Sequence, residues 1–198
     1  MSRPRRAANS VRIIGGSWRG RKLSFADAPG LRPTPDRVRE TLFNWLHGRL
    51  EGKRCLDLFA GSGALGLEAL SRGARLAVLL ESNPSVATHL KAQAAILGAD
   101  SAQIVQTDAG RYLRGASQPF DVIFIDPPFD ANLWTQTAAL LARGAWLAPN
   151  ALIYVESPVQ GEQARLPEEW ETLRDKTAGE VRYRLLRGPA AVPSEIQV

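Results

Sequence analysis

The sequence predicts an α/β fold with a mostly parallel seven-stranded sheet, and two features of the chain support this prediction. Five short apolar segments alternate with segments whose apolar residues recur at helical spacing. Strands that are apolar along their whole length fit a parallel sheet that helices cover on both faces. After Pro158 the pattern changes, and WETLRDKT and EVRYRLLR, joined through Ala178-Gly179, predict an antiparallel hairpin that closes the sheet edge.

The expected strands and helices follow one another without an internal repeat. Strands are expected at about 54–59, 75–80, 102–106, 120–125 and 151–156, and helices at about 64–72, 84–98, 109–114 and 131–146. Asn83-Pro84 predicts the start of one helix, because asparagine caps helices and proline suits the first helical position. Gly98 marks the end of that helix.

A further helix is expected before the first strand of the sheet. Thr34 is its predicted N-cap and Pro35 its first helical residue. Gly48 is its expected end. One apolar stripe at helical spacing lies between them and consists of Val38, Leu42, Trp45 and Leu46.

The composition fits a single domain without a metal centre. The chain has 198 residues, of which 44% are hydrophobic, so it can bury an ordinary core. No apolar segment approaches the ~20 residues that span a bilayer, and the basic N-terminus lacks the apolar region of a signal peptide. One cysteine excludes an internal disulfide, and two histidines argue against a zinc cluster. We therefore expect a cytoplasmic, metal-free protein that does not bind a membrane and is, by default, a monomer.

The N-terminal segment indicates a polyanionic partner. The net charge of the chain is +5, and no acidic residue occurs before Asp27. Residues 1–10 are expected to form a basic, flexible tail. Residues 11–30 are expected to form a β-hairpin, because Gly15-Gly16 separates two short β-like segments.

Within the expected hairpin, one aromatic residue stands among cationic ones. Trp18 is followed by Arg19, Arg21 and Lys22. A stacking face on a positive surface suits single-stranded or splayed-out RNA, so these four residues are predicted to contact RNA. The alternative interpretation is that Trp18 packs the hairpin onto the rest of the domain.

A glycine turn on the first strand-to-helix connection predicts a ligand site. The segment LDLFAGSGALGLEAL contains G-x-G-x-x-G at Gly61, Gly63 and Gly66. Such a turn lets a ligand approach the free N–H groups at a helix N-terminus. The spacing alone does not identify the ligand, because folds that bind nicotinamide cofactors share it.

Acids at the ends of three successive strands favour S-adenosylmethionine over NAD. Asp57 precedes the glycine turn and suits an ammonium group, whereas it would repel a pyrophosphate. Glu81 is placed to accept bonds from both ribose hydroxyls, and Asp108 from the adenine amino group. All three are expected at the carboxyl edge of the sheet, where open α/β sheets bind ligands.

The segment DPPF at the end of the fourth strand predicts chemistry on an amine. The Asp126 carboxylate and the Pro127 carbonyl can each accept one N–H of an exocyclic amino group. These bonds would direct the nitrogen lone pair at a sulfonium methyl group, so the catalysis would consist largely of positioning. Proline stiffens the backbone that presents the carbonyl, and Phe129 offers a face for a flipped-out base.

Four motifs in order resemble the RsmD family of bacterial enzymes, which methylate the N2 of a guanine in small-subunit ribosomal RNA. They are IIGGSWRGRKL, LRPTPDRVRETLFNWL, DLFAGSGALGLEALSRGA and FIDPPF, and the resemblance covers about residues 11–187. It departs from the family only at Pro35, where the family often has threonine. The resemblance implies a Rossmann-like class I methyltransferase domain over 31–188, followed by a C-terminal tail at 189–198.

The resemblance also assigns residue roles. Asp126, Pro127 and Phe129 would handle the base, and Arg32 would contact RNA. The implied cofactor-binding residues are Thr34, Arg37, Asp57, Phe59, Gly61, Gly63, Glu81, Ser82, Asp108 and Ala109.

The implied activity is transfer of a methyl group from S-adenosylmethionine to guanine N2 of 16S ribosomal RNA, within an assembled or assembling 30S particle. Two alternatives stay open. One is a methyltransferase that acts on DNA adenine N6 or on a protein glutamine, and the other is a non-catalytic RNA-binding module.

Overall fold

The computed structural model describes residues 10–25, 34–161 and 164–190. Some predictions therefore concern residues outside the described ones. These are the N-terminal tail except Ser10, the end of the 11–30 segment, Arg32, and the C-terminal tail from residue 191.

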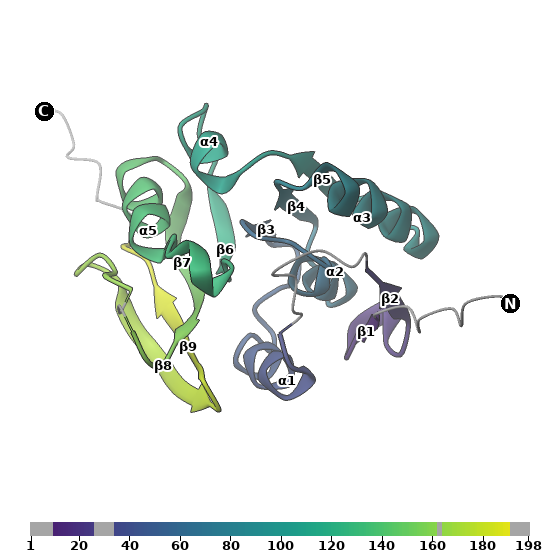
Figure 1. The fold of residues 1–198 in the computed structure, drawn as a ribbon, viewed down its shortest axis with the longest axis horizontal. Coiled ribbons are helices and arrows are strands. Elements are labelled where there is room, and N and C mark those ends of the chain that lie inside the picture. Colours follow the sequence, from purple (N-terminus) through teal and green to yellow (C-terminus); the bar gives the residue numbers. More distant parts are fainter. Residues whose placement is uncertain (1–9, 26–33, 162–163, 191–198) are drawn as a thin grey trace, which may run out of the picture.

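The centre of the fold is a seven-stranded sheet with the order β5-β4-β3-β6-β7-β9-β8 (Figure 1). The strands are β3 Arg54–Asp57, β4 Leu76–Glu81, β5 Ala102–Gln106, β6 Phe120–Ile125, β7 Leu147–Pro158, β8 Glu171–Ala178 and β9 Val181–Arg187. The first five are parallel, and β9 pairs antiparallel with both β7 and β8. The predicted α/β class, the seven-stranded sheet and the C-terminal hairpin are confirmed.

The strand order reverses between β3 and β6. The chain passes from β3 outward to β4 and β5, and then returns to place β6 on the other side of β3. Such a switch point opens a crevice at the carboxyl ends of the strands. The end of β3, which precedes the glycine turn, therefore lies next to the end of β6, which precedes the DPPF segment.

Helices cover the sheet on both faces, as the continuous apolar strands predict. The helices are α1 Asp36–Trp45, α2 Ala64–Ser71, α3 Pro84–Leu97, α4 Ala109–Leu113 and α5 Trp134–Arg143. The first three pack with the N-terminal hairpin into one core cluster, and α4 and α5 pack into the cluster on the opposite face. Side chains of one strand alternate between these clusters, as Cys55 and Leu56 of β3 show.

The two predicted proline-containing helix starts differ in the structure. At α3 the Asn83 side chain accepts bonds from the N–H groups of the first turn, and the helix begins at Pro84 as predicted. At α1 the prediction was wrong by one residue, because Pro35 is the N-cap and Asp36 the first helical residue. Thr34 makes no cap bond there; its hydroxyl instead donates to Asp126 at 2.9 Å. Thr34 therefore bonds Asp126, far away in the sequence, and does not cap the helix that follows it.

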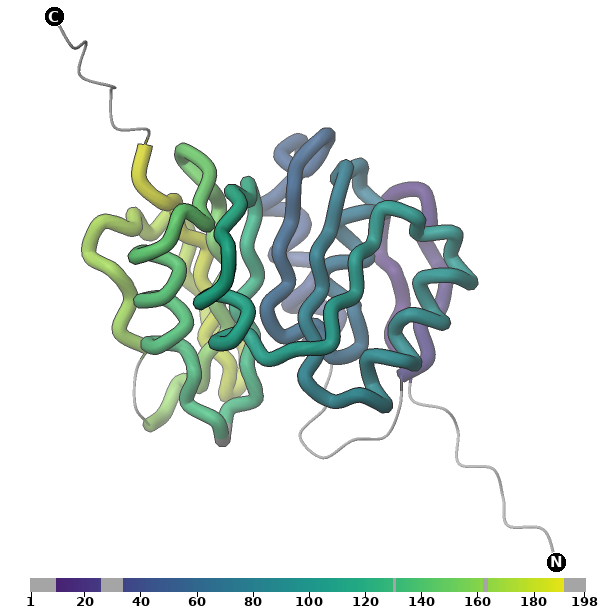
Figure 2. Tube along the Cα trace, turned by 90° about the horizontal axis from the view of Figure 1, so that it is seen from above, coloured from purple at the N-terminus to yellow at the C-terminus, as the bar shows by residue number. Residues whose placement is uncertain are grey.

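The N-terminal hairpin is present, but Gly15-Gly16 is not a tight two-residue turn. Strand β1 (Ser10–Arg12) pairs with β2 (Lys22–Ser24), and a longer connection that includes the short 3-10 helix η1 (Gly16–Trp18) joins them. Gly16 has φ +75°, and a Cβ there would lie 1.7 Å from the Ser71 carbonyl oxygen of α2. The glycine pair thus permits close docking onto α2. Figure 2 shows the hairpin, in purple, beside α3 at one end of the molecule.

Candidate active site

Four acids lie at or near the carboxyl ends of β3, β4, β6 and β7, and we call them the acidic edge: Asp57, Glu81, Asp126 and Glu156. The charges of Glu81 and Asp126 both act on Asp57, and the charge of Asp126 acts on Glu156, so the group is electrostatically connected. Within the described residues, none of the four forms an ion pair with a lysine or arginine. A cationic ligand would therefore find carboxylates that no cation from residues 10–25, 34–161 or 164–190 neutralises.

The glycine turn between β3 and α2 has the geometry that a close backbone approach requires. Gly61 and Gly63 have positive φ values of 49° and 77°. A Cβ at Gly63 would meet a Leu90 methyl group at 2.4 Å, and one at Gly66 would meet Leu79 at 2.7 Å. Gly63 is the N-cap of α2 and has no side chain with which to cap it. In the first turn the Gly66 N–H is taken by Asp57, whereas the N–H groups of Ala64 and Leu65 have no side-chain acceptor among the described residues.

Asp57 is buried below this turn. It is 2% exposed, and its Oδ2 accepts a bond from the Gly66 N–H at 3.0 Å. Burial raises the pKa of Asp57 to about 7; the Gly66 bond opposes this rise, and the charges of Asp126 and Glu81 add to it. Near neutral pH this carboxyl group is therefore poised between its two protonation states, and a neighbouring cation would ionise it.

Glu81 links the glycine turn to the start of α3. One carboxylate oxygen accepts from the Gly61 N–H at 3.0 Å and the other from the Asn83 N–H at 2.7 Å. Each oxygen keeps a second lone pair for a ligand hydroxyl. The structure thus places the predicted ribose acceptor against the glycine turn, and neighbouring Ser82 is exposed.

The remaining predicted cofactor residues lie after β3, after β5 and on α1. Asp108 is exposed and caps α4, since its Oδ1 accepts from the Arg111 N–H at 2.8 Å. Ala109 beneath it is buried. Phe59 is half-buried against the α4–α5 cluster, and Arg37 is exposed on the first turn of α1.

The DPPF segment follows β6 directly. Asp126 is half-buried, Pro127 is buried, and Phe129, in the 3-10 helix η2 (Phe129–Ala131), is 38% exposed. The Phe129 ring lies 5.9 Å from that of Trp134, which supports it from behind. Burial raises the pKa of Asp126, while the bond from Thr34 works against this rise. One Asp126 oxygen is thus taken by Thr34, and the other accepts no hydrogen bond from the described part of the chain.

Sequence reasoning missed Glu156. It is 2% exposed, two residues before the end of β7, and its Oε1 accepts a hydrogen bond from the Tyr154 hydroxyl at 2.7 Å. The Trp134 indole N–H donates to its backbone carbonyl oxygen. Burial and the charge of Asp126 raise the pKa of Glu156 well above its ordinary value, and bonds from Tyr154 and Thr34 oppose this rise. The signal was present, because ALIYVE ends in an acid as the neighbouring strands do.

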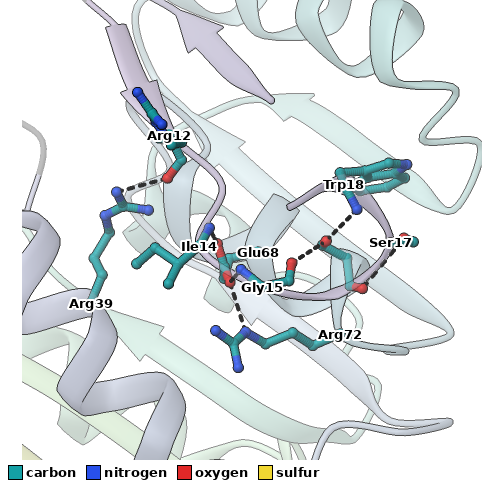
Figure 3. A network of polar contacts seen from close by, with 9 residues as sticks. Arg12, Ile14, Gly15, Ser17, Trp18, Arg39, Glu68 and Arg72 are labelled. Atoms are coloured by element: carbon teal, nitrogen blue, oxygen red, sulfur yellow. Dashed lines mark hydrogen bonds and ion pairs between the residues drawn. The ribbon is translucent and has the colours of Figure 1, made fainter. Parts of the chain in front are cut away.

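The N-terminal hairpin is fixed to α2 by a polar network, the hairpin clamp, which consists of Ile14, Gly15, Glu68, Ser71 and Arg72 (Figure 3). The fully buried Glu68 accepts the Ile14 and Gly15 N–H groups at 2.7 and 2.8 Å and pairs with Arg72 at 2.7 Å. Ser71 donates to the Gly15 carbonyl oxygen at 2.6 Å. The hairpin is therefore held in one orientation relative to the glycine turn, which lies at the other end of α2.

The predicted RNA-contacting residues of the hairpin lie mostly at its surface. Arg19, Arg21 and Lys22 are exposed, and Arg21 also donates to the Ile96 carbonyl oxygen at 3.2 Å. Trp18 is half-buried and packs against the core. Its backbone N–H donates to the Ser71 hydroxyl at 2.9 Å. It contributes to packing and keeps part of its ring accessible.

One candidate from the sequence must be withdrawn. The sequence also offers an alternative RNA surface at the basic residues Arg32, Arg37 and Arg39, of which Arg32 lies outside the described residues. Arg39 does not fit this interpretation. The structure buries it completely. Its guanidinium donates to the Arg12 carbonyl oxygen at 2.9 Å and to Asp36 at 2.7 Å. Arg39 therefore joins the hairpin to α1 and has no exposed surface for RNA.

Comparison with known proteins agrees with this geometry. A family model described as Conserved hypothetical protein 95 matches residues 11–187. The ribosomal RNA small subunit methyltransferase D of Escherichia coli (strain K12) is 48% identical over 98% of this chain and 99% of the relative. That of Haemophilus influenzae is 48% identical over 90% of this chain and 94% of the relative. A solved methyltransferase structure from Escherichia coli, yhhF, is 47% identical with a TM-score of 0.86, covering 92% of this chain and 100% of that chain.

The fold and the acidic edge define a Rossmann-like methyltransferase. Within this class the chain belongs to the RsmD family, as the order of its four motifs indicated. Within the described residues, no helix is long and apolar enough to cross a membrane. Nor do those residues contain a group of three acids, histidines or cysteines that could hold a metal ion.

Proposed function

We propose that the protein transfers a methyl group from S-adenosylmethionine to the exocyclic N2 amine of a guanine in small-subunit (16S) ribosomal RNA. The observation that carries this proposal is the placement of residues 126–129. They stand at the switch point of the sheet, beside the glycine turn, with the Phe129 ring exposed. The relatives from E. coli and H. influenzae are named for methylation of small-subunit ribosomal RNA.

The residues of the acidic edge fit S-adenosylmethionine. This cofactor supplies an electrophilic methyl group on a sulfonium, and its other end carries an ammonium group. Asp57 would hold the ammonium group, Glu81 the ribose hydroxyls and Asp108 the adenine amino group. Carboxylates that pair with no lysine or arginine in the described part of the chain favour a positively charged ligand and disfavour the pyrophosphate of NAD.

The DPPF segment would hold the target amine between two acceptors. The Asp126 oxygen that Thr34 leaves free would accept one N–H, and the Pro127 carbonyl the other. Phe129 would stack on the flipped-out base, with Trp134 behind it. Holding the nitrogen ~3–3.5 Å from the methyl carbon would supply much of the rate enhancement.

The N-terminal hairpin would hold the RNA. Arg19, Arg21 and Lys22 are exposed and would contact phosphates, and the accessible part of Trp18 would stack on a base. Arg32 would add to this surface. The substrate would be an assembled or assembling 30S particle in the cytoplasm, and the enzyme would act as a monomer.

The direct test uses small-subunit particles from cells that lack the enzyme, together with isotope-labelled S-adenosylmethionine. We expect the protein to label one guanine, at N2. Asp126→Ala should lower single-turnover methyl transfer by about 100-fold or more, because the amine loses its principal acceptor. Calorimetry should show that this variant still binds the cofactor. Asp100→Asn, which changes an exposed acid outside the site, is the matched control.

Label on adenine N6 of DNA or on a protein glutamine, with none on ribosomal RNA, would contradict the proposed substrate. Cofactor binding without transfer to any of these substrates would favour the non-catalytic alternative. Unchanged transfer by a folded Asp126→Ala variant would refute the role of the DPPF segment.

A further inference from the structure

Arg184, in the last strand of the C-terminal hairpin, has donors that the described residues do not satisfy. Its Nε and Nη2 atoms are buried, and neither has a hydrogen-bond partner among those residues. The guanidinium group stays charged in proteins, so these N–H groups have lost water without gaining an acceptor. Buried donors without a partner cost free energy. They therefore do not stabilise the free protein, and an acceptor supplied by a ligand would satisfy them.

The register of the strands shows why Arg184 lacks an acid. Asp175 of β8 lies directly opposite Arg184 of β9, so it is the expected partner. Its carboxylate is instead taken by Arg182, whose Nε and Nη2 donate to Oδ1 and Oδ2 at 3.0 and 2.5 Å. Two guanidinium groups thus face one carboxylate in the part of the chain that the structure describes. This place on the sheet has an excess of positive charge.

A second donor without a partner lies on the same face. Ser157 of β7 is fully buried, and within residues 10–25, 34–161 and 164–190 its hydroxyl has no hydrogen-bond partner. Ser157 lies directly opposite Arg182, and Val155 lies directly opposite Arg184. Directly paired residues of antiparallel strands share a face, as do residues two apart on one strand. Ser157, Arg182 and Arg184 therefore lie together on one face of the sheet.

This face adjoins the surface that would hold the target base. Val155 belongs to the same core cluster as Trp134, whose ring supports Phe129. The Trp134 indole donates to the Glu156 carbonyl oxygen, and Ser157 is the next residue. Strands β7, β9 and β8 are adjacent at one end of the sheet, and the N-terminal hairpin lies at the other end (Figure 1 and Figure 2). The switch point of the sheet lies between these two ends.

We propose that Arg184, with Arg182 and Ser157, binds a backbone phosphate of the RNA next to the target guanine. We call these three residues the C-terminal phosphate site. A phosphate oxygen would supply the acceptor that Arg184 lacks, and a guanidinium group can bond two phosphate oxygens at once. Arg182 and its partner Asp175 are partly exposed, so the site opens to the surface. The long side chain of Arg184 can turn outward to the phosphate while β9 stays in place.

This inference rests on the proposed RNA substrate and adds a second place at which the RNA is held. The N-terminal hairpin would bind the RNA at one end of the sheet and the C-terminal phosphate site at the other. The target guanine would then be presented to the DPPF segment between them. A phosphate contact carries no information about the base, so this site would fix the position of the RNA and leave the choice of base to the DPPF segment.

The test replaces Arg184 with methionine, which keeps an unbranched apolar side chain and removes the donors. The melting temperature should stay unchanged or rise, because buried donors without partners are lost. Affinity for small-subunit particles from cells that lack the enzyme should fall about tenfold, as expected for one lost bond to a charged group. The slope of log K against log salt should fall in magnitude by about 0.7 for the lost phosphate contact. Affinity for S-adenosylmethionine should stay constant.

Arg187→Met is the matched control. It removes the same charge from the same strand, but Arg187 pairs with Glu171 and ends β9 away from the carboxyl edge of the sheet. Its affinity for the particles and its salt slope should equal those of the wild type. An equal loss in both variants would overturn the inference, because total charge would then explain the effect. A folded Arg184→Met variant with unchanged affinity would also overturn it, and a lowered melting temperature would then show that Arg184 serves the fold.

A measurement on the wild-type protein separates this inference from the proposed function. Nitrogen-15 NMR of arginine-labelled protein follows the Arg184 Nε–H group without any methylation, and Arg184→Lys identifies its signal even if the methionine variant does not fold. We expect this signal to shift when a single-stranded RNA oligonucleotide is added. Such a shift supports the site even if no guanine N2 is methylated. RNA binding without a shift refutes it even in an active enzyme, as does a shift with inorganic phosphate or an acidic peptide but none with RNA.

Discussion

Glu68 of the hairpin clamp and Glu156 of the acidic edge are both buried glutamates on the same side of the sheet, and they differ in their partners. Glu68 accepts two backbone N–H groups and pairs with Arg72. Glu156 has one side-chain donor, Tyr154, and lies near a second acid, Asp126, whose charge raises its pKa. A buried acid surrounded by matched donors fixes structure, whereas one with few donors beside a second acid has a raised pKa, as functional acids often do. Burial alone does not distinguish these two roles.

Removing the Glu68 side chain should give the largest effect, which is a loss of folding stability. Glu68→Ala leaves Arg72 and the Ile14 and Gly15 N–H groups without their acceptor. Loss of one partner of a buried ion pair costs about 3–5 kcal/mol, and we expect the lower end because Arg72 is partly exposed. Urea unfolding measures this loss, and Glu68→Gln should recover part of it. A loss below about 1 kcal/mol would show that the clamp does not stabilise the fold.

Removing the Glu81 side chain should weaken the binding of S-adenosylmethionine. Glu81→Ala deletes the ribose acceptor and the bonds that hold the Gly61 and Asn83 N–H groups. We expect a loss of about 1.5–3 kcal/mol in S-adenosylmethionine binding, measured by calorimetry. Glu81→Gln retains acceptor capacity and should lose less. Unchanged affinity in a folded Glu81→Ala variant would show that the carboxylate serves only the turn.

The pH dependence of cofactor binding should distinguish the acidic edge from the hairpin clamp, because Asp57 of the acidic edge has a pKa near neutral pH. Below about pH 7 Asp57 is protonated and neutral in the free protein, so it attracts an ammonium group weakly. A bound ammonium group stabilises the ionised form and lowers the pKa of Asp57. Affinity should therefore fall as the pH drops below 7, by at most about tenfold per pH unit, with proton release on binding. Asp57→Asn should remove most of this slope.

The hairpin surface should give the smallest effect, and one that depends on salt. Arg19→Ala combined with Arg21→Ala should weaken RNA binding and flatten its salt dependence by about 0.7 for each phosphate that the protein no longer neutralises. Trp18→Ala should weaken binding without changing the slope. Cofactor affinity should stay constant in the double arginine variant and in Trp18→Ala. If Trp18→Ala lowers only the melting temperature, Trp18 is a packing residue.

Local patterns were sufficient to predict much of the fold and part of the site. The Asn83 cap, the glycine turn and the strand-end acids each follow from residues close together in the chain. The position of β6 beside β3 follows from the general topology of open α/β sheets. These features predict the sheet edge at which Asp57, Glu81 and Asp126 meet.

The errors share a physical cause, which is a partner far away in the sequence. Thr34 looked like a cap, but its hydroxyl bonds an acid 92 positions later. Gly15-Gly16 looked like a turn, but it accommodates Ser71 and Arg72. Arg39 looked like a surface cation, but it donates to Arg12 on the hairpin. Tertiary contacts override local preference at these positions.

The hairpin clamp also affects the order in which the chain can fold during its synthesis. Gly15 bonds a residue 53 positions later, and Arg21 one 75 positions later. An isolated two-stranded hairpin is marginally stable in water. As translation proceeds from the N-terminus, the first strands emerge long before their partners exist. The first segment to be made must therefore wait, with its basic side chains unanchored, until α3 has been synthesised.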